Sequence, residues 1–71
     1  MPELSCASME RILRNAGAER VSAAAVALLS EAMEDYGEKL SREALELARH
    51  AGRKTVKRED VRLAAKRIGQ I

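Results

Sequence analysis

Apolar residues recur along this chain at steps of three and four, the spacing that places side chains on one face of an α-helix. The first such segment covers about residues 5–16 and is followed by Gly17, which suits the position just after a helix end. A second segment runs over about 23–51 without a proline and stops at Gly52, and a third covers about 58–68. The pattern therefore predicts an all-α chain: short helix, loop, long central helix, loop, short helix.

The residues around the expected helix starts agree with this reading. Ser5 or Ser8 could cap the first helix and Ser22 the second, because a serine side chain can accept a hydrogen bond from a backbone N–H of the first turn. Glu59 and Asp60 lie in the first turn of the third helix, where acidic side chains favour the positive end of the helix dipole.

The expected central helix is too long for its neighbours to cover. At roughly 1.5 Å per residue it measures about 43 Å, which exceeds the width of a globule of this size. Its apolar stripe comprises Ala25, Leu28, Leu29, Ala32, Tyr36, Leu40, Ala44, Leu47, Ala48 and Ala51. The third helix is expected to bury Val61, Ala64, Ala65 and Ile68. One short helix on each side cannot cover the long stripe, so we expect it to pack against a second copy of the chain.

Length and composition also favour a partner. A chain of 71 residues forms at most one domain, over 1–71, and buries only about 60% of the surface that its unfolded form exposes. Cys6 is the single cysteine and His50 the single histidine, so neither an internal disulfide nor a closed zinc site is expected, and we predict no metal and no cofactor. Self-association is the simplest remaining source of stability.

Several classes of protein fit the sequence poorly. Tyr36 is the only aromatic residue, which argues against a protein that stacks nucleic-acid bases on aromatic side chains. No segment approaches 18 uninterrupted apolar residues, and the first residues do not resemble a secretory signal. We therefore expect no membrane partner and a cytoplasmic location, with Cys6 reduced.

The positive charge is concentrated at one end of the chain. Residues 31–48 hold six acidic and two basic residues, whereas residues 49–71 hold eight basic and two acidic residues. A localised basic patch is typical of a protein that binds a polyanion. A solvated surface that keeps the protein soluble explains the same charges, and charge alone does not decide between the two.

Three stretches of the chain resemble archaeal histones: RILRNAGAERVS at 11–22, ALELARHAGRKTVKREDV at 44–61 and LAAKR at 63–67. The resemblance covers almost the whole chain and implies a histone fold without tails. It implies a head-to-tail intertwined homodimer whose long helices cross. It also implies an architectural, chromosome-associated protein that binds the phosphate backbone of duplex DNA. Such a protein bends and wraps the duplex and compacts it into nucleosome-like chromatin.

The resemblance, together with residue chemistry, suggests which side chains meet DNA. Arginine and lysine supply fixed positive charge, and a threonine hydroxyl can bind a phosphate oxygen. The expected DNA-binding residues are Arg11, Arg20, Arg53, Lys54, Thr55 and Lys57, with Arg58 adding to the same patch. The basic residues expected to lie on solvated helix faces instead are Arg14, Arg62, Lys66 and Arg67.

Some of these residues have a second reading. Thr55 could serve only to stabilise its turn. Arg53 could form an ion pair with Asp60 inside one protomer, as its family counterpart does. Tyr36, within the apolar stripe, is expected in the core rather than at a ligand site.

The resemblance also points to a contact between dimers. In the family, residues that match Leu47, His50 and Asp60 join one dimer to the next, which implies tetramers or longer arrays on DNA. The alternative for His50 is a partly buried structural histidine. The sequence leaves open whether a paralogous histone replaces the second copy.

We expect the protein to recognise DNA with little dependence on base sequence, because neither proposed contact loop contains the asparagine or glutamine that usually recognises adenine. No enzyme activity is predicted, since no catalytic triad spacing or glycine-rich phosphate loop is present. The main alternative is a histone-fold subunit of a regulatory heterodimer that works through protein contacts. A helix-turn-helix repressor is a third possibility, and the long central helix argues against it.

Overall fold

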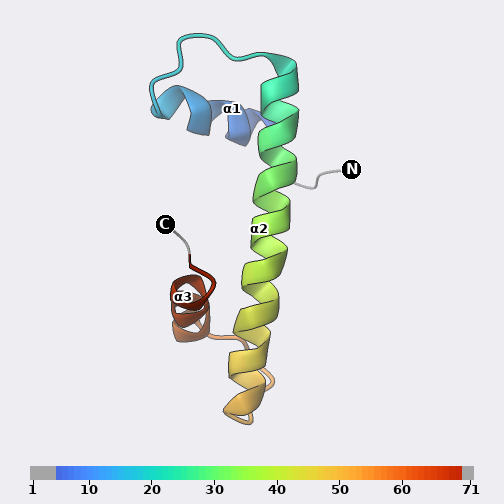
Figure 1. Cartoon of the computed structure of the whole chain (residues 1–71), viewed down its shortest axis with the longest axis vertical. Helices are drawn as coiled ribbons and strands as arrows, with labels where there is room; N and C mark the ends of the chain where they lie inside the picture. Colours follow the sequence, from blue (N-terminus) through green and yellow to red (C-terminus); the bar gives the residue numbers. More distant parts are fainter. Residues whose placement is uncertain (1–4, 70–71) are drawn as a thin grey trace. The chain divides into compact units, whose positions relative to one another are not determined.

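The computed structural model describes residues 5–69, which form three α-helices joined by two loops (Figure 1). Helix α1 spans Cys6–Asn15, α2 spans Ala23–His50 and α3 spans Arg58–Arg67. The predicted short–long–short order is confirmed, and each helix begins and ends within one residue of the range expected from the sequence. No strand occurs among the described residues.

Side-chain hydrogen bonds mark the start of each helix. The Ser5 hydroxyl accepts from the Ser8 backbone N–H at 3.3 Å, so the first of the two candidate serines is the cap of α1. The Ser22 hydroxyl accepts from the N–H of Ala25 at 3.0 Å at the start of α2. At the start of α3 the corresponding acceptor is a carboxylate inside the first turn, which belongs to Asp60.

Glycines with positive φ end the first two helices. Gly17 has φ +114° and Gly52 has φ +74°, a region that L side chains rarely adopt. After α2, the Gly52 N–H donates to the Arg49 carbonyl and the Arg53 N–H donates to the Ala48 carbonyl, each at 2.9 Å. These two bonds form a Schellman motif, which reverses the chain and fixes the backbone of Arg53 at the first position beyond the turn.

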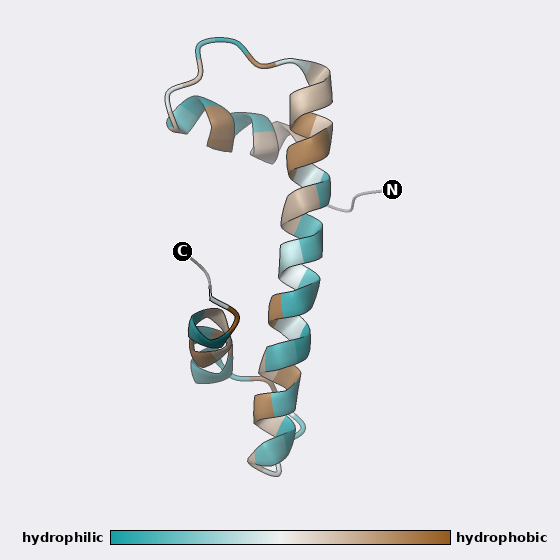
Figure 2. Ribbon diagram, in the orientation of Figure 1, coloured by the Kyte–Doolittle hydropathy of each residue, from teal (hydrophilic) through white to brown (hydrophobic). Residues whose placement is uncertain are grey.

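The chain divides into two compact units, Met1–Asp35 and Tyr36–Ile71, with the boundary inside α2. In the first unit, α1 and the first part of α2 share a small core that contains Met9, Val26 and Ser30. The Ser30 hydroxyl is buried and has no hydrogen-bond partner among the residues that the structure describes. In α2 the hydrophobic residues gather toward the two ends, and the segment between them is mostly hydrophilic (Figure 2).

In the second unit, α3 packs against the later part of α2. Its core is made of alanines, with Ala44, Ala48 and Ala64 almost fully buried, and this permits close packing of the two helices. An ion pair between Arg67 and Glu43 at 3.2 Å also joins α3 to α2. Arg67 was expected on a solvated face; its side chain is half exposed but is paired.

Much of the apolar surface predicted to be buried is exposed in the single chain. Of the α2 stripe, only Ala44 and Ala48 are buried, while Leu28 is 66% exposed and Tyr36 37% exposed. The stripe was expected to be covered by a second copy of the chain, so the placement of Tyr36 in a core remains a prediction. On α3, Val61 is 40% exposed, so it does not belong to the buried face that was predicted for it. In the first unit α1 covers only part of the surface of α2, and in the second unit α3 likewise leaves part of that helix exposed.

Candidate functional site

The loop between α2 and α3 is built around an ion pair between Arg53 and Asp60. The Schellman motif positions Arg53, and the first turn of α3 positions Asp60. The Arg53 Nη1 donates to Asp60 Oδ2 at 2.8 Å, and Nη2 donates to Oδ1 at 2.9 Å. The Asp60 side chain is 5% exposed and that of Arg53 is 28% exposed. This bidentate geometry is the strong form of an arginine–carboxylate contact, and it joins the two residues of the expected intraprotomer pair.

The same contacts keep both groups charged. The hydrogen bond from Arg53, together with the Lys57 backbone N–H that donates to Asp60 Oδ2 at 2.7 Å, lowers the pKa of Asp60 to about 2. Desolvation by burial opposes this effect but is the smaller influence. The bond to Asp60 likewise raises the pKa of Arg53 above its ordinary value. The pair is therefore ionised throughout the neutral pH range.

Arg53 also shapes the loop backbone, because its Nη1 donates to the Thr55 carbonyl at 2.9 Å. It is therefore the carbonyl of Thr55, and not its hydroxyl, that takes part in the turn. Within residues 5–69 that hydroxyl makes no hydrogen bond, and Lys54, Thr55 and Lys57 are all exposed. Thus the charge of Arg53 is neutralised inside the protein, while its neighbours present two free cations and a free hydroxyl.

The loop between α1 and α2 is held by Arg14. The Arg14 Nε and Nη2 donate to Glu10 Oε2 at 3.1 and 3.0 Å, and Nη1 donates to the Glu19 carbonyl at 3.3 Å. Arg20, which directly follows Glu19 in the sequence, is exposed and forms no ion pair with any residue that the structure describes. Arg11 is exposed on α1. Arg14 was expected on a solvated face, so its contact with the loop is a structural role that the sequence pattern did not reveal.

The candidate DNA-contacting residues fall into two groups, one in each compact unit. Arg11 and Arg20 belong to the first unit, and the second holds Arg53, Lys54, Thr55 and Lys57. The residues proposed for contacts between dimers all lie in the second unit. Leu47 is half-buried and His50 is exposed, one turn apart near the end of α2, and Asp60 is buried beneath Arg53.

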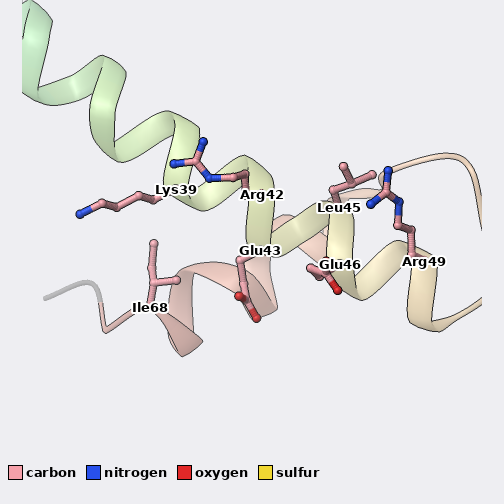
Figure 3. Close-up of a pocket in the computed structure, with 7 residues that line it drawn as sticks. All are labelled: Lys39, Arg42, Glu43, Leu45, Glu46, Arg49 and Ile68. Atoms are coloured by element: carbon pink, nitrogen blue, oxygen red, sulfur yellow. The ribbon is translucent and has the colours of Figure 1, made fainter.

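An open cavity of about 600 Å³ lies in the second unit, outside the contact loop. Ile68 contributes from the end of α3, and the other lining residues are on α2 (Figure 3). Its lining is Lys39, Arg42, Glu43, Leu45, Glu46, Arg49 and Ile68. Cations and acids alternate there, and Glu43 is already paired with Arg67, so the cavity has no uniform charge to select a ligand.

Neither a metal centre nor a membrane-spanning helix is found in the described part of the chain. Across residues 5–69 no group of three or more histidine, cysteine, aspartate or glutamate side chains is placed to hold a metal ion. Over the same residues, none of the helices has the length and apolar composition needed to cross a lipid bilayer.

Comparison with known proteins adds to this geometry. A family model described as "Histone-like transcription factor (CBF/NF-Y) and archaeal histone" matches residues 2–65. An archaeal histone from Thermococcus zilligii, named as a subunit of HAN1, is 56% identical over 66 residues, covering 93% of this chain and 98% of the relative. Probable archaeal histone 3 from Methanocaldococcus jannaschii is 50% identical over 64 residues, covering 90% and 96% of the two chains.

Proposed function

This chain belongs to the family of histone-like transcription factors and archaeal histones, and we propose that it binds duplex DNA as an architectural protein that bends, wraps and compacts it. The family description names archaeal histones and histone-like transcription factors, and no enzyme. The observation that supports the proposal most directly is the arrangement of charged side chains in the two loops. In each, an arginine–carboxylate pair fixes the backbone while neighbouring cations stay unpaired in the described structure. We propose that residues 1–71 act as one histone-fold domain, cytoplasmic and chromosome-associated.

A homodimer is part of the proposal, and the exposed apolar residues of α2 support it. With 3.6 residues per turn, the buried residues of α2 lie on one line of the helix within each unit: Val26 and Ser30 in the first, Ala44 and Ala48 in the second. The apolar residues Leu29, Met33, Tyr36, Leu40 and Leu47 lie on the adjacent side, where they are half-buried or exposed. A second copy packed along that side would remove this surface from water, which is favourable at about 25 cal/mol per Å².

Head-to-tail pairing would complete the DNA-binding surface. In the geometry that the family resemblance implies, the second loop of one chain lies beside the first loop of its partner. Each end of the dimer then presents Arg20 of one chain with Lys54 and Thr55 of the other, and Arg11 extends the surface along α1. Contacts of this kind go to phosphates, so they fix position on the duplex and carry little sequence information.

We further propose that dimers join on DNA into tetramers or longer arrays through Leu47, His50 and Asp60. Asp60 Oδ2 accepts two hydrogen bonds within the chain and Oδ1 accepts one, which leaves Oδ1 a lone pair for an outside donor. The exposed imidazole of His50 from a neighbouring dimer is a suitable donor.

A mixed pair with a paralogous histone is the second candidate assembly. The name of the Thermococcus relative designates it as one subunit of HAN1, which favours a partner of different sequence. The family description also names transcription factors, and a regulatory heterodimer that works through protein contacts would follow that branch. The exposed cations of both loops favour DNA packaging over this alternative.

Nuclease digestion of DNA reconstituted with the pure protein tests the proposal. We expect a ladder of protected lengths that grows by regular increments as protein is added, because each dimer shields its own length of duplex. Uniform degradation at saturating protein would contradict DNA wrapping. A ladder that requires a co-purified second chain would instead identify the mixed pair as the active form.

A further inference from the structure

Arg14 joins α1 to the loop that follows it. Two of its nitrogens, Nε and Nη2, are held by one oxygen of Glu10, a turn earlier in the same helix. Its third bonded nitrogen, Nη1, donates to the carbonyl oxygen of Glu19, five residues further along the chain. Three of its five N–H donors are thus committed, and Glu10 balances its charge.

The Glu19 carbonyl belongs to the peptide group that leads into Arg20. A peptide group is planar, so fixing the direction of the carbonyl also fixes the N–H of Arg20 and the start of its backbone. We propose that Arg14, oriented by Glu10, is a positioning residue for Arg20: it restricts the loop so that the Arg20 side chain is directed at the phosphate backbone before DNA arrives. This inference rests on the proposed function, because it assigns a role in DNA binding.

The second loop contains the same device with different spacing. There Arg53 is held by a carboxylate, that of Asp60, and donates from Nη1 to a loop carbonyl, that of Thr55. In both loops the carbonyl belongs to a residue that directly adjoins or is itself a candidate DNA contact. The two loops therefore share one arrangement although their sequences differ. An arginine that is neutralised by a carboxylate orders the loop, and an unpaired cation beside the bound carbonyl is free to contact DNA.

The alternative is that Arg14 itself contacts a phosphate. The two interpretations predict different combined effects on DNA affinity when Arg14 and Arg20 are both replaced. A positioning residue acts through Arg20, so its removal has no effect once Arg20 is gone. A direct contact acts alone, so its removal costs the same with or without Arg20.

The test is a double-mutant cycle on DNA affinity, with Arg14→Ala, Arg20→Ala and the double variant, measured on one duplex across a series of salt concentrations. Arg14→Ala should weaken binding about two- to fivefold, as expected for an exposed ion pair and one loop contact. In the Arg20→Ala background it should change affinity less than about twofold and leave the salt slope unaltered. A direct phosphate contact would instead lower that slope by about 0.9.

Two more variants keep the inference falsifiable if Arg14→Ala proves unstable. Arg14→Lys keeps the charge but cannot reproduce the planar fork, so it should bind as weakly as Arg14→Ala. Glu10→Ala frees the guanidinium and should weaken binding even though it removes a negative charge. Arg62→Ala, an exposed arginine of α3, is the matched control and should bind as the wild type does.

The outcomes separate this inference from the proposed function. If the wild type does not bind duplex DNA, both fall. If the wild type binds but Arg20→Ala leaves its affinity unchanged, the positioning role falls and the proposed function stands on the other contacts. If Arg20→Ala weakens binding but Arg14→Ala adds its full effect in the double variant, only the positioning role is wrong. Stronger binding by Glu10→Ala would also overturn that role.

Discussion

Asp60 holds the guanidinium of Arg53 through both carboxylate oxygens, with Oδ2 2.8 Å from Nη1 and Oδ1 2.9 Å from Nη2. The same carboxylate accepts the Lys57 backbone N–H that opens α3. One side chain thus joins the end of the α2–α3 loop to its beginning. Because Asp60 is buried and its hydrogen bonds depend on its negative charge, we expect acid to destabilise the loop.

The first prediction is a loss of stability at low pH. The pKa of Asp60 lies at about 2 in the folded chain, below its ordinary value of 3.8, so the unfolded state takes up the proton first. The contribution of Asp60 to stability is therefore complete above about pH 4 and is lost as the pH falls toward 2. Denaturant unfolding at a series of pH values should display this loss. Asp60→Asn should be less stable at pH 7 and should lack that part of the pH response. Glu59→Gln, an exposed neighbour, should keep it.

The second prediction concerns the salt dependence of DNA binding. Arg20→Ala and Lys54→Ala should each weaken binding to all duplex sequences alike. Each should also flatten the plot of log affinity against log salt, by about 0.9 for every phosphate that is no longer neutralised. Titrations at several salt concentrations measure both effects, and Arg62→Ala is the control. A variant that altered sequence preference without altering the slope would indicate direct reading of bases instead.

The third prediction tests the dimer through α2. Tyr36→Lys places a charge on the exposed apolar side of the helix and should convert the dimer to a poorly folded monomer. Glu38→Lys inserts the same residue about half a turn away, on a polar side, and should leave the dimer intact. Sedimentation gives the mass, and the thermal midpoint of a dimer rises with protein concentration. A wild-type midpoint that stays constant over a hundredfold dilution, with a monomeric mass, would refute the dimer.

The fourth prediction separates the joining of dimers from the binding of DNA. His50→Ala should keep salt-dependent binding, because the proposed DNA contacts lie elsewhere, but its nuclease footprints should shrink toward those of single dimers. Lys54→Ala is the complementary control: it should weaken binding yet retain long footprints at saturating protein. If His50→Ala gives the full wild-type ladder, His50 has only a structural role.

The fifth prediction concerns the buried hydroxyl of Ser30. It is 1% exposed and its oxygen has no partner among the described residues, so the folded chain bears a desolvation cost that an alanine would not. Ser30→Ala should raise the free energy of unfolding by about 1 kcal/mol or more, measured by denaturant titration. Ser41→Ala, an exposed serine of the same helix, should gain only the difference in helix propensity, about 0.5 kcal/mol. An equal gain in both variants would mean that burial of the hydroxyl costs nothing.

Helix positions were readable from the sequence because their limits depend on local chemistry. Gly17 and Gly52 follow the helix ends where positive φ is needed, and Ser22 begins α2 with a side-chain hydrogen bond. Each of these features involves residues only a few positions apart, so the order of residues along the sequence is enough to predict it. The pairing of Arg53 with Asp60 spans seven positions and a loop, and it was anticipated from family resemblance rather than from spacing.

Other features depend on arrangement in space and were missed. The i,i+4 spacing of Glu10 and Arg14 suggests a surface pair, but no sequence pattern reveals that the remaining nitrogen meets the carbonyl of Glu19. The periodicity of apolar residues identified the apolar faces of α2 and α3. It does not show which part of each face is buried by the same chain and which part is left exposed. Tyr36 and Val61 were therefore assigned to a core that the single chain does not complete.

The division of the chain inside α2 has a consequence for how such proteins diversify. Each unit carries one loop. In the head-to-tail pair that we propose, the loops that meet at one end come from different chains. A pair of unlike chains therefore has ends that neither like pair possesses. An organism with several such genes could change how tightly its DNA is held by altering their relative expression, with no change in any coding sequence.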